Sequence, residues 1–176
     1  MRGTHIIEVL PKEGVKDPTG SGLQNDVRQL GVKSAKQVRS SQLYRLVGEL
    51  ASQDRRRIAK DLLTDPVTQE YKDGAVNLVE VKPKKGRSSS FLVDVWYKSG
   101  VTDVIGESVL KGIRDLEISS ITEVRTGMRY RFEGLPNVQT AEKIALALLV
   151  NPLVHDQFIS ATTPLADPPK TRWRTC

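Results

Sequence analysis

An internal duplication places the strongest constraint on how this chain can fold. Residues 5–72 align without a gap with residues 91–158, at a constant offset of 86 positions. Twenty of the 68 aligned positions are identical, among them Asp17 with Asp103. Because a repeat of this length encodes one structural unit twice, the sequence predicts two similar halves rather than one larger domain.

The length of 176 residues suits two domains of about 80 residues each. We expect copy one at residues 1–81, a linker at 82–90, copy two at 91–162 and an extended tail at 163–176. The linker reads KPKKGRSSS, and its proline, glycine, serine and positive charge are typical of a connection between domains. The tail is rich in proline and has no periodicity, and Trp173 within it is a candidate docking anchor.

The first half of each copy has the pattern of a strand followed by a helix. Residues 5–10 and residues 91–96 alternate with the period of two that is typical of a strand. Both faces of this strand have apolar groups, so we expect a second sheet, supplied by the other copy, to cover its open face. Apolar side chains spaced four and three apart then predict a helix around Leu23–Leu30 and another around Val109–Leu116.

A two-stranded hairpin is predicted next in each copy. Its strands are expected at residues 35–40 and 43–47 in copy one, and at residues 121–126 and 129–132 in copy two. Gly127 can supply the tight turn of the second hairpin, because glycine tolerates a positive φ angle. Serine and glutamine occupy the same place in copy one, which is less favourable turn chemistry.

A second helix and a closing strand complete each copy. The helix is expected at residues 54–63 and 140–150, and the closing strand of copy one includes residues 75–81. The sequence of the second of these helices is apolar nearly all round, which predicts burial on more than one side, either deeper in an assembly or against a partner. The predicted fold class is α+β: two tandem β-α-β-β-α-β copies, with antiparallel sheets and two helices each, packed as a single-chain pseudo-dimer.

The composition limits where such a protein acts. No run of 18 or more apolar residues is present, so the sequence predicts no membrane-spanning helix. The N-terminus lacks the apolar stretch of a secretory signal, and the single cysteine, Cys176, has no partner for an internal disulfide. These features lead us to expect a cytoplasmic protein.

No set of residues with a catalytic or ligand-binding spacing is found. His5 and His155 lie outside any metal-ligand spacing, and the sequence Thr19-Gly-Ser-Gly22 lacks the remainder of a phosphate-binding loop. Asp17 and Asp103 each precede a predicted helix, where an N-cap role is expected. We therefore predict no catalytic, cofactor-binding or metal site on this chain.

Recurrent polar residues near the predicted hairpins are the candidate interface residues: Arg39, Tyr44, Arg45, Arg125, Tyr130 and Arg131. The arginines have two interpretations, which are strand-surface charge with salt bridges between the copies, or contact with an acidic partner. The net charge of +6 also permits a nucleic-acid partner that binds the basic linker. The aromatic consensus of RNA-binding sheets is absent, so the sequence does not favour that alternative.

Three short motifs resemble the PurS family, the small subunit of phosphoribosylformylglycinamidine (FGAM) synthase. Copy one has the D-P-x-G of the family at residues 17–20 and its L-L-x-x-P-V-x-x-x-Y pattern at residues 62–71. Copy two has the V-R-x-G of the family at residues 124–127. Each copy lacks a residue that the other keeps, since Ser41 replaces the glycine of V-R-x-G and Val104 replaces the proline of D-P-x-G.

The resemblance implies a role in purine biosynthesis. PurS is a non-catalytic, dimeric adaptor that joins the glutaminase PurQ to the ATP-using synthetase PurL and helps ammonia pass between them. It needs no cofactor of its own, because the PurL partner uses the ATP and magnesium of this ligase. Two fused copies are then a single-chain dimer. The alternatives are a detached N-terminal region of a long-form PurL, or a tandem ligand-sensing domain of the ACT type.

Overall fold

The computed structural model describes residues 3–74 and 89–162. Copy one consists of β1 (Gly3–Pro11), α1 (Pro18–Gln29), β2 (Gln37–Gly48), α2 (Ser52–Arg57), η1 (Ile58–Leu63) and β3 (Gln69–Gly74). Copy two consists of β4 (Ser89–Tyr97), α3 (Val104–Asp115), β5 (Ile121–Leu135), α4 (Val138–Ile144), η2 (Ala145–Leu149) and β6 (His155–Thr162). The closing strand expected at 75–81 and the candidate anchor Trp173 lie outside the described residues. Strand β4 begins within the segment expected as a linker.

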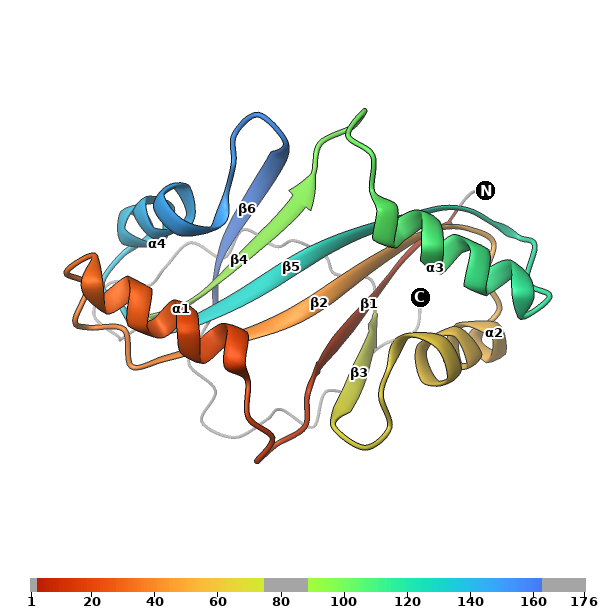
Figure 1. Cartoon of the computed structure of the whole chain (residues 1–176), viewed down its shortest axis with the longest axis horizontal. Helices are drawn as coiled ribbons and strands as arrows, with labels where there is room; N and C mark the ends of the chain where they lie inside the picture. Colours follow the sequence, from red (N-terminus) through yellow and green to blue (C-terminus); the bar gives the residue numbers. More distant parts are fainter. Residues whose placement is uncertain (1–2, 75–88, 163–176) are drawn as a thin grey trace.

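The six strands form one antiparallel sheet in the order β3-β1-β2-β5-β4-β6 (Figure 1). The two copies meet at its centre, where β2 pairs with β5, and β3 and β6 form its two edges. The α+β class and the tandem arrangement are confirmed. The expected second sheet is wrong, because the copies join edge to edge through backbone hydrogen bonds and not face to face.

The predicted hairpins are also wrong. Strand β2 is a single strand of 12 residues and β5 one of 15, so each copy has the order β-α-β-α-β. The residues expected to turn, Gln42 and Met128, lie directly opposite each other in the β2–β5 ladder. A hairpin turn at either place would break the ladder between the copies. The partner strand therefore stabilises the extended form, which the local sequence did not reveal.

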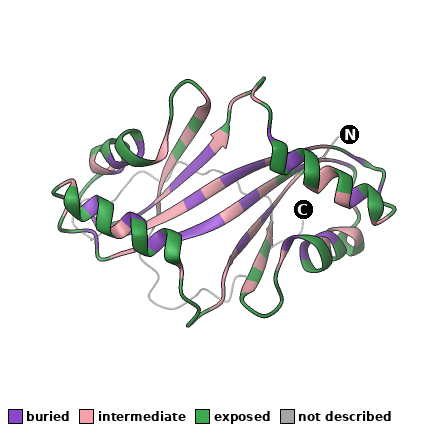
Figure 2. Cartoon of the chain, in the orientation of Figure 1, coloured by how far each residue is buried: buried purple, intermediate pink, exposed green. Residues whose placement is uncertain are grey.

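Each of the two core clusters contains helices from both copies. In the first cluster, Val27 of α1 packs with Ile144 of α4 and Phe91 of β4. In the second, Ile58 of η1 packs with Ile113 of α3 and Ile7 of β1. Figure 1 shows α1 beside α4 and α3 beside α2, and Figure 2 marks buried residues along these helices. Neither copy buries its core alone, so the fold depends on both.

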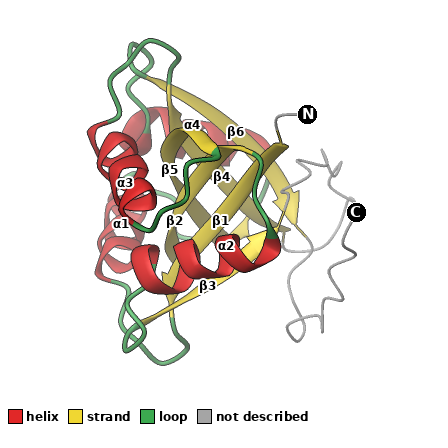
Figure 3. Ribbon diagram, turned by 90° about the vertical axis from the view of Figure 1, so that its right-hand side faces the viewer, coloured by secondary structure: helices red, strands yellow, loops and turns green. Residues whose placement is uncertain are grey.

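The helices all pack on the same face of the sheet. The residues of both core clusters share one parity through the middle of each strand, such as Val38 and Leu46 on β2. The exceptions, Ile121 and Leu135, lie beyond register shifts at the two ends of β5. Figure 3 shows α1 and α3 together on one side of the twisted sheet. No helix of residues 3–74 and 89–162 contributes to the opposite side, which we call the helix-free face.

Two aspartates attach helices to the central strands. Asp17 caps α1 by accepting from the Gly20 amide at 2.8 Å, and it also accepts from the amide and hydroxyl of Ser40 on β2 at 2.6 and 2.8 Å. Asp103 does the same for α3, with the Gly106 amide at 2.8 Å and the amide of Thr126 on β5 at 2.6 Å. The predicted N-caps are confirmed, and each cap also holds its helix against a strand.

The glycine after each cap is required by close packing. A Cβ atom on Gly20 would lie 2.6 Å from the carbonyl oxygen of Val38, and one on Gly106 would lie 2.5 Å from that of Val124. The glycine of the D-P-x-G motif therefore lets the first turn of the helix touch the central strand. This contact recurs in both copies, even though copy two lacks the proline.

Within the described chain, the apolar second helix of copy two is buried on one side only, and its expected burial in an assembly or against a partner stays a prediction. Ala141, Ile144 and Ala145 are buried, but Leu146 and Leu148 are 56% and 37% exposed. The sheet covers only one side of this helix (Figure 2), so the apolar side chains on its other side remain at the surface. The corresponding helix of copy one presents charged groups there, including Lys60.

Candidate functional site

The junction between the copies has pseudo-twofold symmetry. Residue 42 and residue 128 differ by the repeat offset of 86 and are paired with each other, so the axis passes through this pair. The axis relates the cross-strand pair Arg39–Arg131 to the pair Arg45–Arg125. The four recurrent arginines are therefore two equivalent pairs on the intercopy strands. Their parity places all four on the helix-free face.

Each arginine pair sets two like charges directly opposite each other, which is unfavourable without neighbouring compensation. One pair has visible compensation. Arg125 Nε donates to Glu123 Oε1 at 2.7 Å, and Arg125 Nη1 donates to the Val101 carbonyl at 3.1 Å. The guanidinium of Arg45 lies 5.9 Å from the ring centroid of Trp96. Intercopy salt bridging between these arginines and the opposite copy, as first interpreted, is not among the described contacts; contact with an acidic partner stays a prediction.

The recurrent tyrosines lie on the opposite, helix-covered face. Tyr44 packs against the second core cluster and Tyr130 against the first. Burial raises the pKa of both phenols, and the charge of Asp17 raises the pKa of Tyr130 further. Both rings are half-buried beneath helices, so neither is presented on an open sheet face where a nucleic-acid base could stack.

A buried ion cluster lies on the helix-free face beside the axis. Arg129 on β5 donates to both carboxylate oxygens of Asp94 on β4, each at 2.7 Å, and to Glu8 on β1 at 3.1 Å. The Ser41 hydroxyl on β2 donates to the other oxygen of Glu8 at 2.6 Å. Four strands from both copies therefore contribute one side chain each.

The cluster holds its arginine charged. Burial opposes the charge of Arg129, but the hydrogen bonds and charges of Asp94 and Glu8 outweigh that effect and raise its pKa. Sequence reasoning missed the cluster because the copies differ here, with Leu43 at the position equivalent to Arg129. Only the strand register brings Asp94 opposite Arg129, so no local pattern could have identified the pair.

The glycine of V-R-x-G has a packing role and not a turn role. Gly127 lies inside β5, opposite Trp96 on β4, and a Cβ atom on it would lie 2.7 Å from the indole ring. The ring covers the glycine on the helix-free face, and Arg45 lies over the ring. In this motif Val124 packs in the core, and Thr126 hydrogen-bonds to Asp103, a helix-to-strand contact that we call a clasp, as we do the Asp17–Ser40 contact. Gly127 leaves room for the ring of Trp96.

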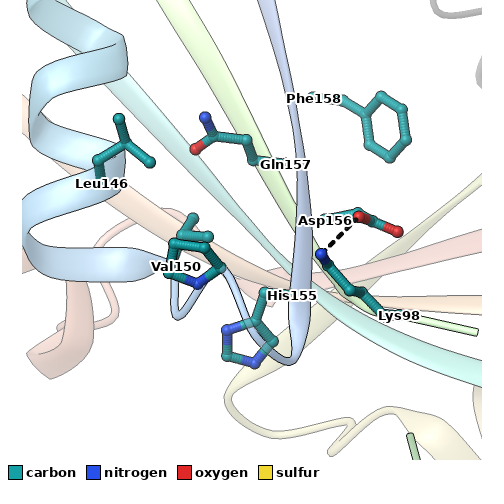
Figure 4. Close-up of a pocket in the computed structure, with 8 residues that line it drawn as sticks. Lys98, Leu146, Val150, His155, Asp156, Gln157 and Phe158 are labelled. Carbon is teal, nitrogen blue, oxygen red and sulfur yellow. Dashed lines mark ion pairs between the residues drawn. The ribbon is translucent and has the colours of Figure 1, made fainter. Parts of the chain in front are cut away.

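The two ends of the sheet differ in chemistry. We call η1 with β3 the copy-one end and η2 with β6 the copy-two end. The copy-two end has an open groove of about 330 Å³ (Figure 4), and its lining residues are Lys98, Leu146, Val150, Pro152, His155, Asp156, Gln157 and Phe158. At the copy-one end, exposed Lys60 and Lys72 occupy the positions equivalent to Leu146 and Phe158.

The described residues include no group of three or more histidine, cysteine or acidic side chains that could hold a metal ion. Among the described helices, none has the length and apolar character needed to cross a membrane. What the geometry defines is a class: a single-chain, α+β pseudo-dimer whose distinctive features are surfaces and strand edges.

A comparison with family profiles identifies the family. The profile of PurS, phosphoribosylformylglycinamidine (FGAM) synthase, matches twice, at residues 4–76 and 90–162. The two matches, of 73 residues each, cover 146 of the 176 residues, so the chain belongs to the PurS family and contains two tandem copies of it. The family is part of the FGAM synthase of purine biosynthesis. A search of curated proteins found no match.

Proposed function

We propose that this chain is a non-catalytic adaptor subunit of FGAM synthase that joins PurL to PurQ. In this role it assists the transfer of ammonia, from glutamine hydrolysis on PurQ, to the ATP- and magnesium-using reaction on PurL. The complex then converts formylglycinamide ribonucleotide to formylglycinamidine ribonucleotide in the cytoplasm. The chain supplies contacts to this ligase and no reacting group.

The observation that supports the proposal most directly is the double family match on a pseudo-dimer with shared cores. Two fused copies need no separate association step, because the copy that completes each core belongs to the same chain. A fused dimer can also have two different ends, as Lys60 and Leu146 illustrate at equivalent positions. An adaptor between two unlike subunits needs such a difference.

Reconstitution tests the proposal. Purified PurL and PurQ are mixed with and without the chain, and formation of the amidine product is measured with glutamine and, separately, with ammonium chloride as nitrogen source. We expect glutamine-dependent synthesis to require the chain and ammonium-dependent synthesis to proceed without it. Equal glutamine-dependent rates in both mixtures, with no ternary complex in gel filtration, would contradict the adaptor role.

A further inference from the structure

The two edge strands of the sheet are protected to different degrees. Among the described residues of strand β3, Glu70, Lys72 and Asp73 are charged. Strand β6 has eight residues, and Asp156 is its only acidic or basic residue apart from His155. Proteins prevent unwanted pairing at sheet edges with short strands and charged side chains, lysine above all. Edge β3 has this protection, and edge β6 lacks it.

Edge β6 has the groups that an added strand needs. Within residues 3–74 and 89–162, β6 pairs with β4 on one side and with no strand on the other. A row of backbone N–H and C=O groups therefore faces outward along its eight residues. An extended peptide that pairs with such a row gains backbone hydrogen bonds, while its alternate side chains meet whatever lies on the two faces.

Exposed apolar side chains are present on both faces of this edge. Phe158, 47% exposed, points to the helix-free side, and Leu146, 56% exposed, lies on the helix side across the groove (Figure 4). Leu148 and Leu153 extend the apolar surface, but their equivalents Leu62 and Val67 in copy one are also exposed, so Leu146 and Phe158 are the residues that distinguish this end. A strand beside β6 would place its successive side chains alternately against the leucine side and the phenylalanine side.

The polar groups of the groove indicate a segment without strong charge. Lys98 and Asp156 lie 4.0 Å apart, so the charges at the rim of the groove balance. Gln157 Oε1 is buried and accepts no hydrogen bond from the described residues. A hydrogen-bond donor on the bound segment would satisfy this oxygen, so a segment with one polar residue among apolar ones would fit the groove.

From these contacts we propose that β6 binds an extended, mainly apolar segment of one partner subunit of the synthase as a seventh strand. Apolar side chains of the segment contact Leu146 on one face and Phe158 on the other. The inference deepens the proposed adaptor function and rests on it. It assigns one of the two unlike partners to the copy-two end, and it leaves the charged copy-one end to a different contact.

Substitutions that give the copy-two end the residues of the copy-one end test the proposal. In the full chain, Leu146→Lys with Phe158→Lys reproduces Lys60 and Lys72 at the equivalent positions. Both target side chains are exposed, so the fold is retained, as circular dichroism and thermal unfolding will show. The matched control is Lys60→Leu with Lys72→Phe. Affinity for purified PurL and for purified PurQ is measured by calorimetry.

We expect the lysine pair to weaken binding of one subunit by about 100-fold, because two apolar contacts are lost and two charges enter the interface. Binding of the other subunit should change by less than about threefold, within the range of surface substitutions. The control pair, Lys60→Leu with Lys72→Phe, should leave unchanged the affinity for the subunit whose binding the lysine pair weakens. Hydrogen exchange supplies a second readout, since an added strand slows exchange at alternate amides of β6 that face outward in the free chain.

The possible outcomes separate the two proposals. If the unchanged chain binds neither subunit, the adaptor function itself is overturned. If the chain binds but the lysine pair binds both subunits normally, only the strand-docking site is overturned. Sedimentation of the unchanged chain gives a third outcome: a dimer that the lysine pair dissociates would make a second copy the occupant of β6 and would also overturn the proposal.

Discussion

The two copies keep the aspartate contacts that join a helix to each central strand, and they differ at several positions of their outer ends. At the centre, Asp17 bonds Ser40 in copy one, and Asp103 bonds Thr126 in copy two with nearly the same distances. At the outer ends, charged Lys60 and Lys72 of copy one correspond to apolar Leu146 and Phe158 of copy two. The strands that these aspartates hold, β2 and β5, pair with each other, so a change there affects both halves. Within the described residues, β3 and β6 each pair with one strand of their own copy only.

One difference near the axis shows what fusion permits. Arg129 of copy two corresponds to Leu43 of copy one, and both are buried on the helix-free face. The single arginine serves a carboxylate from each copy, Asp94 and Glu8. In a dimer of identical chains this position would hold two arginines or none. A fused chain can place one charged group beside its own axis.

Replacing Arg129 by the leucine of copy one should have the largest effect on the stability of the fold. Arg129→Leu gives copy two the residue of copy one, and it leaves Asp94 and Glu8 buried without their counter-charge. We expect it to lower the free energy of unfolding by about 4 kcal/mol, in the range for breaking a buried ion pair. Urea denaturation followed by circular dichroism measures the change.

The matched control for this substitution is Arg125→Leu, on the same strand and the same face. Arg125 pairs with Glu123 at a partly exposed site. We expect a loss below about 1 kcal/mol, as for other partly exposed pairs. Equal losses for the two variants would contradict the interpretation that burial makes the Arg129 cluster important.

Breaking the shared clasps should have the next largest effect. Asp103→Ala leaves the Thr126 amide and hydroxyl without an acceptor in a buried site, and we expect a loss of about 3 kcal/mol. Asp17→Ala at the less buried clasp should cost about 2 kcal/mol. The control is Asn137→Ala, which removes an exposed N-cap of α4 that contacts no strand and should cost about 1 kcal/mol. A urea midpoint for Asn137→Ala that lies below those of both Asp17→Ala and Asp103→Ala would disprove this order.

Gly127 packs against the ring of Trp96, and its equivalent in copy one is Ser41, so a substitution at Gly127 tests whether this packing contributes to stability. A methyl group on Gly127 must displace the indole ring, so we expect Gly127→Ala to cost about 2 kcal/mol through overpacking. Gly22→Ala is the control, because no neighbouring atom lies within 4 Å of its added methyl group. That variant should be neutral or should stabilise α1 by up to about 1 kcal/mol. Thermal unfolding of the two variants measures the difference, and equal unfolding temperatures for Gly127→Ala and Gly22→Ala would contradict the packing role of Gly127.

The smallest effect is expected at His5, whose equivalent in copy two is the fully buried Phe91. Burial and the neighbouring charge of Arg55 lower the pKa of His5 below 6.5. The unfolded chain therefore binds more protons just below pH 6.5, and stability rises with pH through that range. His5→Phe should flatten this rise. Denaturation curves measured at several pH values between about 5 and 7.5 would show it, and an unchanged slope would exclude His5 as the source.

Part of the fold and of the candidate site could be predicted from the residues alone. The spacing of Leu23, Val27 and Leu30 gave the first helix, and Asp17 gave its cap, because both depend on local geometry. Gly127 was assigned to a turn for an equally local reason, and that assignment was wrong. The contacts of Arg129 with Asp94 and Glu8 could not be found, since their side chains meet only after four strands take their register.

The sequence by itself determined that the protein is a duplicated α+β chain of the PurS kind, because repeated motifs and apolar periodicity are properties of the order of residues. Only the tertiary structure decided that β2 and β5 are continuous strands and that they join the copies into one sheet. It also decided that each core includes helices from both halves. The physical reason is that a strand is stabilised by its neighbour. The same residues form a hairpin or a continuous strand according to which backbone lies opposite them.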